Sequence, residues 1–365
     1  MRITRLALKD WRNIEQASLD VDSRFIVLHG NNAQGKTNLL EAIYTLATLR
    51  SFREKRPRQL IRTGEPCATI EANVEGDLGK HRLQWQFEGS ERTLKLEGSA
   101  PSSLQDWFNP IRVVLFCPDH IGLVRGQPIL RRQFIDRARF TAAPTYLDVV
   151  RSFKRTLRQK SALLKRVSVS DAELDVWNRR FAKESVEVIK HRKQMISEIK
   201  EPFQRIMKTL SETENVDLTT KGLGSQDLSQ QDLVDRMDEH RQEERRRKMV
   251  LVGPHRDDLD IWIDNRLARN FASQGQARSI VLALKLAEIQ AAKNRGQTPM
   301  FLLDDLTGEL DQDRMKRLTE LLLKLDNQVW ITTTDPAHLG GLPADVINSW
   351  CVREGSVSRD ETPCL

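Results

Sequence analysis

One octapeptide with the pattern G-x-x-x-x-G-K-T limits what this chain can fold into more than any other segment. It follows the apolar run Arg24–Leu28 and precedes the helical pattern Asn38–Ile43. A strand, a glycine-rich loop and a helix in this order are typical of a phosphate site, because the glycines let backbone N–H groups point inward and the helix N-terminus adds a positive dipole. The residues expected to hold the phosphates are Gly30, Asn31, Asn32, Ala33, Gln34, Gly35, Lys36 and Thr37.

Two residues of this loop carry most of the chemistry. We expect Lys36 to reach the β- and γ-phosphates and the hydroxyl of Thr37 to bind Mg²⁺. An ordinary glycine-containing turn is the alternative, and it is less favoured because strand, helix, Lys36 and Thr37 are all in place. The pattern therefore predicts binding of a nucleoside triphosphate.

Composition limits the class of protein and its compartment. The chain has 365 residues, enough for one large domain with an insertion or for two domains. No apolar run approaches the roughly 18 residues of a membrane-spanning helix, and the segment Met1–Leu6 reads as a strand rather than a signal peptide. Four scattered cysteines without a C-x-x-C pair argue against a zinc site or a disulfide framework. We expect a cytoplasmic protein, and the net charge of +7 hints at a polyanionic partner.

Strand patterns occupy both ends of the chain, and helical patterns occupy its middle. Residues 68–96 alternate apolar and polar side chains in three runs, which predicts an antiparallel meander. Further strands are predicted at 3–11, 17–21, 24–29, 111–116, 259–264, 299–305 and 328–333, with a closing hairpin at 346–358. We expect one α/β domain split by a helical insertion, with segments 1–135, 136–249 and 250–365.

The middle segment predicts an antiparallel helical arm. Apolar residues recur at helical spacing on both sides of a break near residue 168, and Ser170–Glu173 has the form of a capping box that opens the second helix. Pro202 is expected to end or kink that helix. A polar stretch follows, and then one more charged helix at 231–249.

A second motif is an apolar run that ends in two acids. Pro299–Leu303 precedes Asp304 and Asp305, and in P-loop ATPases such a strand delivers an acid to the Mg²⁺ shell. We assign Asp304 to Mg²⁺ and Asp305 to the attacking water. A core strand ending in a polar turn is the alternative, which the upstream phosphate loop makes less favoured. The next residues, 308–311, resemble the loop that follows this strand in the ABC class.

A third motif opens a strongly apolar helix, and its residues are Ser273, Gln274, Gly275 and Gln276. A serine hydroxyl and a glycine N–H at a helix N-terminus can bind a phosphate. Simple N-capping is the alternative, and Ser273 can do both. The order of the three motifs resembles ABC-type ATPases, in which the serine motif meets the γ-phosphate held by a second subunit. One copy of each motif then implies a homodimer.

Several longer motifs make the chain similar to the RecF family of SMC-like ABC ATPases, over essentially its whole length. They are 28–43, 115–120 with 123–126, 131–136, 252–258 and 273–279. The resemblance implies an ABC-type P-loop ATPase head with a mixed sheet and an antiparallel β subdomain, split by an α-helical arm. It also implies ATP and Mg²⁺ as cofactors and an ATP-dependent homodimer that binds single-strand gaps and duplex junctions. RecR, and through it RecO and RecA, are the implied partners, with slow DNA-stimulated hydrolysis.

The chain departs from the usual ABC pattern at two catalytic positions. Asp305 stands where many ABC ATPases have a glutamate, which favours slow catalysis. The switch histidine expected after the last core strand is missing; Thr334 stands near that place, and His338 follows several residues later. The expected catalytic residues are therefore Asp305, Lys36 and Thr334.

Basic residues on the arm are the candidate DNA contacts, because phosphate contacts need only well-placed lysines and arginines. They are Arg151, Lys154, Arg155, Arg158 and Lys160, and further basic runs lie at 50–58 and 245–248. A solvated charged surface is the alternative for each. At the level of function, a non-enzymatic scaffold held together by ATP and a transporter nucleotide-binding subunit are the alternatives to a repair ATPase.

Overall fold

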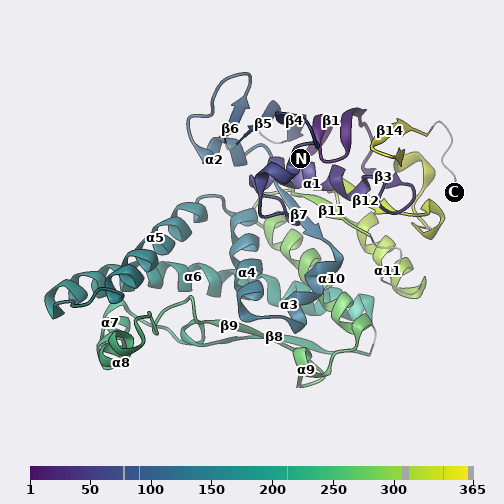
Figure 1. The fold of residues 1–365 in the computed structure, drawn as a ribbon. Helices are drawn as coiled ribbons and strands as arrows, with labels where there is room; N and C mark the ends of the chain where they lie inside the picture. Colours follow the sequence, from purple (N-terminus) through teal and green to yellow (C-terminus); the bar gives the residue numbers. More distant parts are fainter. Residues whose placement is uncertain (77–78, 90, 212, 306–311, 340, 361–365) are drawn as a thin grey trace. The chain divides into compact units, whose positions relative to one another are not determined.

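The computed structural model describes residues 1–360 apart from 77–78, 90, 212, 306–311 and 340 (Figure 1). The chain forms two compact units. Unit 1 comprises Met1–His120, Thr209–Ser211 and Ala292–Leu365, and unit 2 comprises Ile121–Lys208 and Glu212–Ala291. The boundaries expected from the sequence, at 135/136 and 249/250, mark changes in the residue pattern, whereas the two units are defined by how compactly the chain folds. These boundaries therefore stay a prediction.

Unit 1 is built around a mixed six-stranded sheet with the order β14-β13-β3-β12-β11-β7. Its strands are β3 (Phe25–His29), β7 (Val113–Phe116), β11 (Met300–Leu303), β12 (Val329–Thr333), β13 (Ile347–Arg353) and β14 (Ser356–Arg359). The first five run parallel and β14 pairs antiparallel with β13. Parallel strands are typically buried on both faces, and β7, β11 and β12 are buried throughout.

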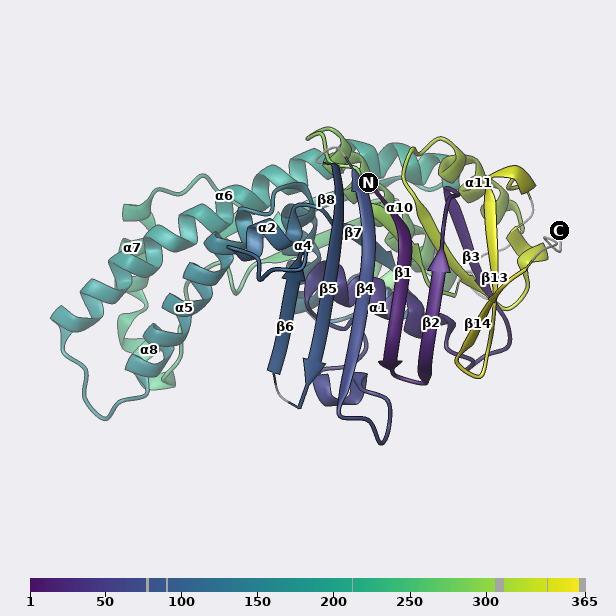
Figure 2. The same ribbon diagram turned by 90° about the horizontal axis from the view of Figure 1, so that it is seen from above.

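A second, antiparallel sheet of unit 1 has the order β2-β1-β4-β5-β6, and Figure 2 looks onto it. Its strands are β1 (Arg2–Trp11), β2 (Ile14–Asp20), β4 (Cys67–Gly76), β5 (Gly79–Glu88) and β6 (Glu91–Leu96). Buried and exposed residues alternate along β4 and β5, as expected for strands with one face on a core. The predicted antiparallel meander is therefore confirmed.

Helix α1 (Lys36–Thr48) packs against strands of both sheets of unit 1. Ten of its thirteen residues are buried, and two tryptophans fix its backbone: the indole N–H of Trp11 donates to the carbonyl of Asn38 at 2.8 Å, and that of Trp107 donates to Leu46 at 2.9 Å. The other helices of this unit are η1 (Pro57–Leu60), α2 (Leu104–Phe108), η2 (Pro118–Ile121), α11 (Gln312–Leu323), η4 (Pro336–Leu339) and η5 (Ala344–Val346).

Unit 2 contains the helical arm and a small sheet. Its helices are α3 (Gly122–Arg125), α4 (Pro128–Ala142), α5 (Tyr146–Leu164), α6 (Asp171–Leu210), η3 (Leu223–Ser225), α7 (Gln230–Glu239), α8 (Arg241–Arg247), α9 (Ala268–Phe271) and α10 (Gln274–Lys293). Its strands β8 (Val216–Lys221), β9 (Asp258–Ile263) and β10 (Arg266–Leu267) form an antiparallel sheet of order β10-β9-β8. None of the helices in the described residues is long and apolar enough to cross a membrane.

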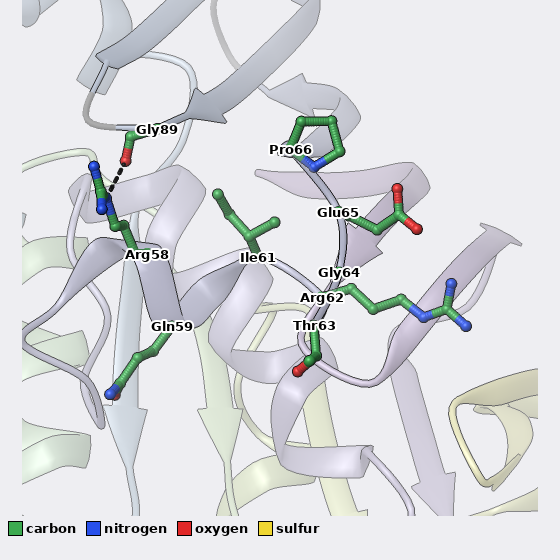
Figure 3. A pocket seen from close by; sticks show the side chains of 9 residues that line it. All are labelled: Arg58, Gln59, Ile61, Arg62, Thr63, Gly64, Glu65, Pro66 and Gly89. Carbon is green, nitrogen blue, oxygen red and sulfur yellow. Dashed lines mark hydrogen bonds between the residues drawn. The ribbon is translucent and has the colours of Figure 1, made fainter.

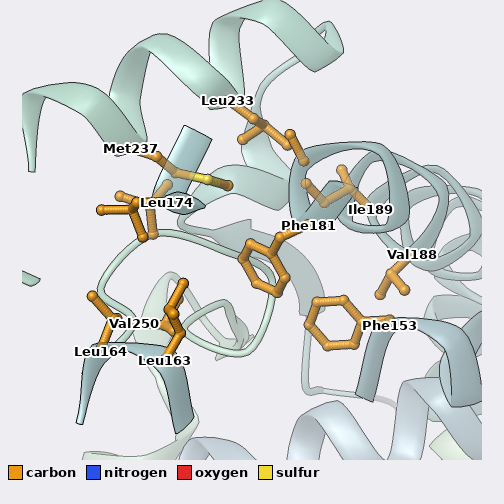
Figure 4. Packing of buried hydrophobic residues seen from close by; sticks show 12 residues of the cluster. Phe153, Leu163, Leu164, Leu174, Phe181, Val188, Ile189, Leu233, Met237 and Val250 are labelled. Atoms are coloured by element: carbon orange, nitrogen blue, oxygen red, sulfur yellow. The ribbon is translucent and has the colours of Figure 1, made fainter. Parts of the chain in front are cut away.

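A hydrophobic cluster of α5, α6, α7 and the 250–252 segment holds the arm together (Figure 4). Phe153 and Phe181 stack with ring centroids 5.5 Å apart, and Leu233 and Met237 of α7 are fully buried in the same cluster. The ammonium of Lys160 lies 2.9 Å from the Glu244 carboxylate, and both side chains are inaccessible to solvent. Removing one partner of such a pair costs about 3–5 kcal/mol.

Two of the longer sequence motifs meet in one charged network of unit 2. Arg131 donates to both carboxylate oxygens of Asp258 at 2.7 and 2.9 Å. Arg192 holds Asp136 in the same bidentate way at 2.8 and 2.9 Å and also donates to the carbonyl of Pro254 at 2.7 Å. These paired groups tie α4 and α6 to the 253–258 loop, so the motifs 131–136 and 252–258 have a shared structural role.

The structure corrects two helix predictions. Helix α6 does not end at Pro202 but continues to Leu210. The single helix expected at 231–249 is two helices, α7 and α8, separated at His240. By contrast, the N-cap at Ser170 is confirmed, because its Oγ accepts from the backbone N–H of Glu173 at 3.2 Å. The closing hairpin is also confirmed as β13 and β14.

His255 makes the stability of unit 2 depend on pH. Burial, opposed by a contact from its Nε2 to the carbonyl of Val250 at 3.1 Å, lowers its pKa from 6.5 to about 4. Between these pH values His255 therefore binds more protons in the unfolded chain than in the folded chain. The free energy of unfolding falls as pH drops from 6.5 toward 4, by up to about 3 kcal/mol.

Urea unfolding of wild type and His255→Gln across this pH range measures how the free energy of unfolding depends on His255. His240→Gln, at an exposed histidine, is the control; parallel profiles for wild type and His255→Gln would contradict the assignment.

Candidate nucleotide site

The predicted nucleotide residues of unit 1 lie at one edge of its parallel sheet. Strands β3, β11 and β12 are neighbours and parallel, so the segments that follow them emerge at the same edge. The phosphate loop follows β3, Asp304 and Asp305 follow β11, and Thr334 follows β12. The topology thus brings together motifs that are about 270 residues apart in the sequence.

Backbone geometry explains the glycines of the phosphate loop. Gly30 has a φ of 138°, and a Cβ there would lie 2.3 Å from the carbonyl oxygen of Val352. Gly35 has a φ of 119° and would bring a Cβ within 2.8 Å of the Asn13 side chain. Only glycine combines this conformation with such close approach. The loop is therefore a tight, closely packed turn rather than a loose connection.

Two neighbouring turns hold the loop from outside. The backbone N–H groups of Glu354 and Gly355, in the β13–β14 turn, donate to Gln34 at 2.6 and 2.9 Å. Asn13, in the turn between β1 and β2, donates to the Gln34 carbonyl at 3.0 Å and accepts from the Asn38 side chain at 2.7 Å. Because Gln34 is held by both turns, the loop is ordered before any phosphate arrives.

Lys36 is buried at the base of the loop. Its ammonium donates to the carbonyl oxygens of Gly30 and Asn31, at 2.5 and 2.8 Å. Burial lowers the pKa of Lys36, and the nearby carboxylates of Asp305 and Asp304 partly oppose that shift. These contacts keep the ammonium inside the curve of the loop, where phosphate oxygens would be its partners.

A short chain of hydrogen bonds joins the three strand ends. The hydroxyls of Thr37 and Thr332 both donate to one carboxylate oxygen of Asp304, each at 2.8 Å. The Thr332 hydroxyl in turn accepts from the backbone N–H of Asp305 at 2.8 Å. A threonine hydroxyl and a carboxylate are the oxygen ligands that P-loop proteins offer to Mg²⁺, so Thr37 and Asp304 fit this ion.

Asp304 is strongly influenced by its surroundings. Burial raises its pKa, the hydrogen bonds from Thr37 and Thr332 oppose that rise, and the charge of Asp305 adds to it. The positive charge of Arg53, whose guanidinium donates to the Asn38 side chain at 2.9 Å, also lowers the Asp304 pKa. A bound cation at this position would favour the ionised carboxylate.

The two other expected catalytic residues are exposed. Asp305 has a φ of 51°, which turns the chain sharply after Asp304. Thr334 lies in a bend directly after β12. His338 lies in η4, and the predicted loop residues 308–311 lie outside the described residues.

The serine motif caps a helix of unit 2. The hydroxyl oxygen of Ser273 accepts from the backbone N–H of Gln276 at 3.1 Å, and the Gln276 side chain accepts from the Ser273 N–H at 2.7 Å. Gln274 and Gly275 form the first turn of α10, and Ser273 and Gln274 are exposed. Ser273 is therefore an N-cap, and this capping leaves the serine open to solvent.

The candidate DNA residues separate into two kinds. Arg151, Lys154, Arg155 and Arg158 lie exposed along one side of α5, and Arg151 forms a loose ion pair with the exposed Asp148 at 3.9 Å. Lys160 is wrong as a DNA contact, because it is fully buried against Glu244. In the basic run at 245–248, Arg245 pairs with Asp171, and Arg246 and Arg247 both pair with Glu243.

Sequence reasoning missed four supports of the site: Asn13, Arg53, Thr332 and the 354–355 turn. Arg53 lies in the basic run 50–58 and the 354–355 turn lies in the predicted closing hairpin, but neither pattern indicated a role beside the phosphate loop. Asn13 and Thr332 lie in no recognised motif. The only local signal was the presence of Thr332 near the end of a predicted strand. That position does not indicate which groups its hydroxyl contacts.

A shallow hollow of about 460 Å³ lies apart from the phosphate-loop residues (Figure 3). Its lining comes from residues 58–59, 61–66 and Gly89, and Arg58 donates a hydrogen bond to the Gly89 carbonyl at 3.1 Å. None of the predicted phosphate ligands lines it.

Solved structures define the class of the fold. A structure of the recombination mediator protein RecF with ATP in the RecFOR pathway superposes with a TM-score of 0.88 at 24% identity, covering 98% of this chain and 97% of that chain. The Smc head domain of Pyrococcus furiosus, bound to the C-terminal domain of ScpA, gives a TM-score of 0.59 at 16% identity, covering 98% and 95%. The fold is therefore an SMC-like, ABC-type ATPase head with a helical insertion.

Sequence relatives define the family. The DNA replication and repair protein RecF of Geobacter sp. (strain M21) is 38% identical over 343 residues, which cover 92% of this chain and 93% of that protein. The protein of the same description from Geotalea uraniireducens (strain Rf4) is 35% identical over 364 residues, covering 98% and 100%. The chain belongs to the RecF family of DNA replication and repair proteins. No family model matches it.

Replacing Thr332 by valine tests the hydrogen-bond chain. Valine keeps the shape but removes the donor to Asp304 and the acceptor for the Asp305 N–H. Because a hydrogen bond to a charged group contributes about 1.5–3 kcal/mol, we expect ATP turnover to fall about tenfold or more. Phosphate release and Mg²⁺-ATP affinity measure the effect. Thr45→Val is the matched control, since the buried Thr45 hydroxyl has no hydrogen-bond partner among the described residues; equal reductions in both variants would contradict the role.

Proposed function

We propose that this chain is an ATP-dependent DNA-binding protein of recombinational repair and replication, in which ATP closes a homodimer on DNA and slow hydrolysis reopens it. The observation that carries the proposal is the convergence of Thr37 and Asp304, 2.8 Å apart, beside the buried Lys36. These are the groups that a P-loop ATPase needs on the β- and γ-phosphates and on the metal. Membership of the RecF family supplies the setting of repair.

In this proposal the residues from Gly30 to Thr37 bind the triphosphate with backbone N–H groups. Lys36 leaves its loop carbonyls for the β- and γ-phosphate oxygens, where its charge offsets theirs. Mg²⁺, when bound by Thr37 and Asp304, would neutralise phosphate charge as it does in related ATPases. Thr332 keeps Asp304 oriented, and Asp305 positions the attacking water.

Slow turnover follows from the residues after β11 and β12. The shorter Asp305 replaces the usual glutamate, and Thr334 replaces the usual switch histidine as a contact to the γ-phosphate. Both side chains are exposed, so neither is held in place by packing. We therefore place this chain among weak ATPases that DNA stimulates.

The dimer is proposed because the serine motif and the phosphate loop occur once each. Ser273 is exposed at the N-terminus of α10, where its hydroxyl and the helix dipole can meet the γ-phosphate bound by a second copy. ATP then forms part of the interface. A structural relative is described as RecF with ATP in the RecFOR pathway, which supports RecR, and through it RecO and RecA, as partners.

DNA is proposed to lie along the exposed basic side of α5. Arg151, Lys154, Arg155 and Arg158 have the spacing i, i+3, i+4 and i+7, so they form one stripe. A stripe of point charges recognises the backbone rather than the sequence of single- and double-stranded DNA. The alternative of an ATP-dependent scaffold without useful hydrolysis remains, because Asp305 and Thr334 are weak catalytic choices.

Replacing Lys36 by alanine tests the dependence of assembly on ATP. We expect wild type to sediment as a dimer with ATP and to bind gapped DNA, and Lys36→Ala to stay monomeric. Sedimentation with and without gapped DNA, together with phosphate release, measures both properties. Lys80→Ala, at an exposed lysine of β5, is the control. ATP-independent DNA binding by a permanent monomer would refute the proposal, and an ATP-dependent dimer without DNA-stimulated turnover would favour the scaffold.

Replacing Ser273 by aspartate separates capping from phosphate contact. Aspartate is a good N-cap, so α10 should keep its stability, but its charge would repel the γ-phosphate of the partner. We expect the ATP-dependent dimer to disappear while the ATP affinity of the monomer stays unchanged. Ser170→Asp is the matched control, because Ser170 caps α6 with the same geometry. A dimer that persists in Ser273→Asp would exclude the trans contact.

Replacing Arg151, Arg155 and Arg158 together by glutamine tests the DNA stripe. The dependence of the DNA affinity on salt should weaken by about 0.9 in logarithmic slope for each duplex phosphate that the variant no longer binds. Fluorescence anisotropy over a range of salt concentrations measures this slope. Arg246 and Arg247 replaced by glutamine form the control, since both pair with Glu243. If the salt dependence of DNA affinity changes in the control and not in the α5 variant, the DNA does not lie along α5.

A further inference from the structure

Three side chains with metal-binding atoms converge directly beside the phosphate loop. His29 ends β3, Cys351 is its register partner on the neighbouring strand β13, and Asp360 follows β14. The ligand atoms of the three residues all lie within 4.8 Å of one another. The imidazole of His29 contacts the Asp360 carboxylate, with side-chain exposures of 17% and 26%, and Cys351 is half-buried.

This ligand set suits one class of ion. An imidazole nitrogen, a thiolate sulfur and a carboxylate oxygen together favour Zn²⁺ and similar transition metals over Mg²⁺ or Ca²⁺. Tetrahedral bonds of about 2.0–2.3 Å would place the ligand atoms about 3.3–3.8 Å apart, and the three ligand atoms here all lie within 4.8 Å of one another. We propose that His29, Cys351 and Asp360 form a transition-metal site of the zinc class, with one coordination position left open.

Such a site would act on the phosphate loop through adjacent residues. His29 precedes Gly30, and Cys351 precedes Val352, whose carbonyl lies so close to Gly30 that only a glycine fits there. The turn between β13 and β14 also holds Gln34 through Glu354 and Gly355. A bound ion would fix this hairpin to the end of β3 and so change the affinity for nucleotide. The site needs neither hydrolysis nor DNA, so it stands independently of the proposed function.

Cobalt titration of the nucleotide-free full-length chain tests the site. A thiolate ligand gives Co²⁺ a charge-transfer absorption band, and we expect this band to saturate at one equivalent. Cys351→Ser removes the band, and Asp360→Asn weakens cobalt affinity about tenfold or more, since even indirect supports of metal ligands have effects of this size. The background carries Cys364→Ser, which removes a thiol outside the described residues.

Cys67→Ser is the matched control, because Cys67 is a half-buried cysteine on β4; this variant keeps the band. Absence of the band in the background protein, or its survival in Cys351→Ser, overturns the proposal. If Cys351→Ser does not fold, as judged by circular dichroism, Asp360→Asn tests the proposal instead. Unchanged cobalt affinity in Asp360→Asn means that His29 and Asp360 form an ion pair only.

A second measurement tests the effect of the ion on nucleotide binding. ATP affinity measured with and without one equivalent of Zn²⁺ should differ in the background protein and not in Asp360→Asn. Equal ATP affinities in the background protein refute the coupling between the metal site and the phosphate loop.

Discussion

The hydrogen bonds around Asp304 are the interaction on which the rest of the nucleotide site depends. One carboxylate oxygen accepts from Thr37 at the start of α1 and from Thr332 on β12, while Thr332 also holds the backbone of Asp305. A buried carboxylate without these donors would be costly, because desolvation favours its neutral form. The same groups that stabilise the buried Asp304 therefore orient it toward Thr37 and the proposed Mg²⁺ position.

Paired charges have a corresponding role in unit 2. Arg131 and Arg192 pair with Asp258 and Asp136, and Lys160 pairs with Glu244, in the largely buried interior of unit 2. Buried pairs of this kind contribute little net stability but strongly penalise arrangements that separate them. They also show that some of the many basic residues of the chain are buried and hold the fold, whereas others are exposed at the surface. Net charge alone does not make this distinction.

Local signals predicted much of the fold correctly. The strand, loop and helix around residues 30–37, the meander, the N-cap at Ser170 and the closing hairpin depend on residues close together in the chain, and the structure confirms them. Of the two outcomes predicted at Pro202, the helix end was wrong, because α6 continues through the proline to Leu210, and the kink stays a prediction. The prediction at Lys160 was wrong because helical spacing places a basic residue on a side of α5 without saying what covers that side. Thr332 and Asn13 had no motif at all.

The sequence by itself determined that a strand, a glycine-rich loop and a helix follow one another, with Lys36 and Thr37 at the positions that a phosphate site requires. It also determined the class of ATPase, through the order of three motifs. The tertiary structure alone decided that Thr332 joins Asp304 to the backbone of Asp305, and that His29, Cys351 and Asp360 converge. The physical reason is strand pairing: parallel neighbours bring together residues that are far apart in the chain, and no local pattern records which strands will be neighbours.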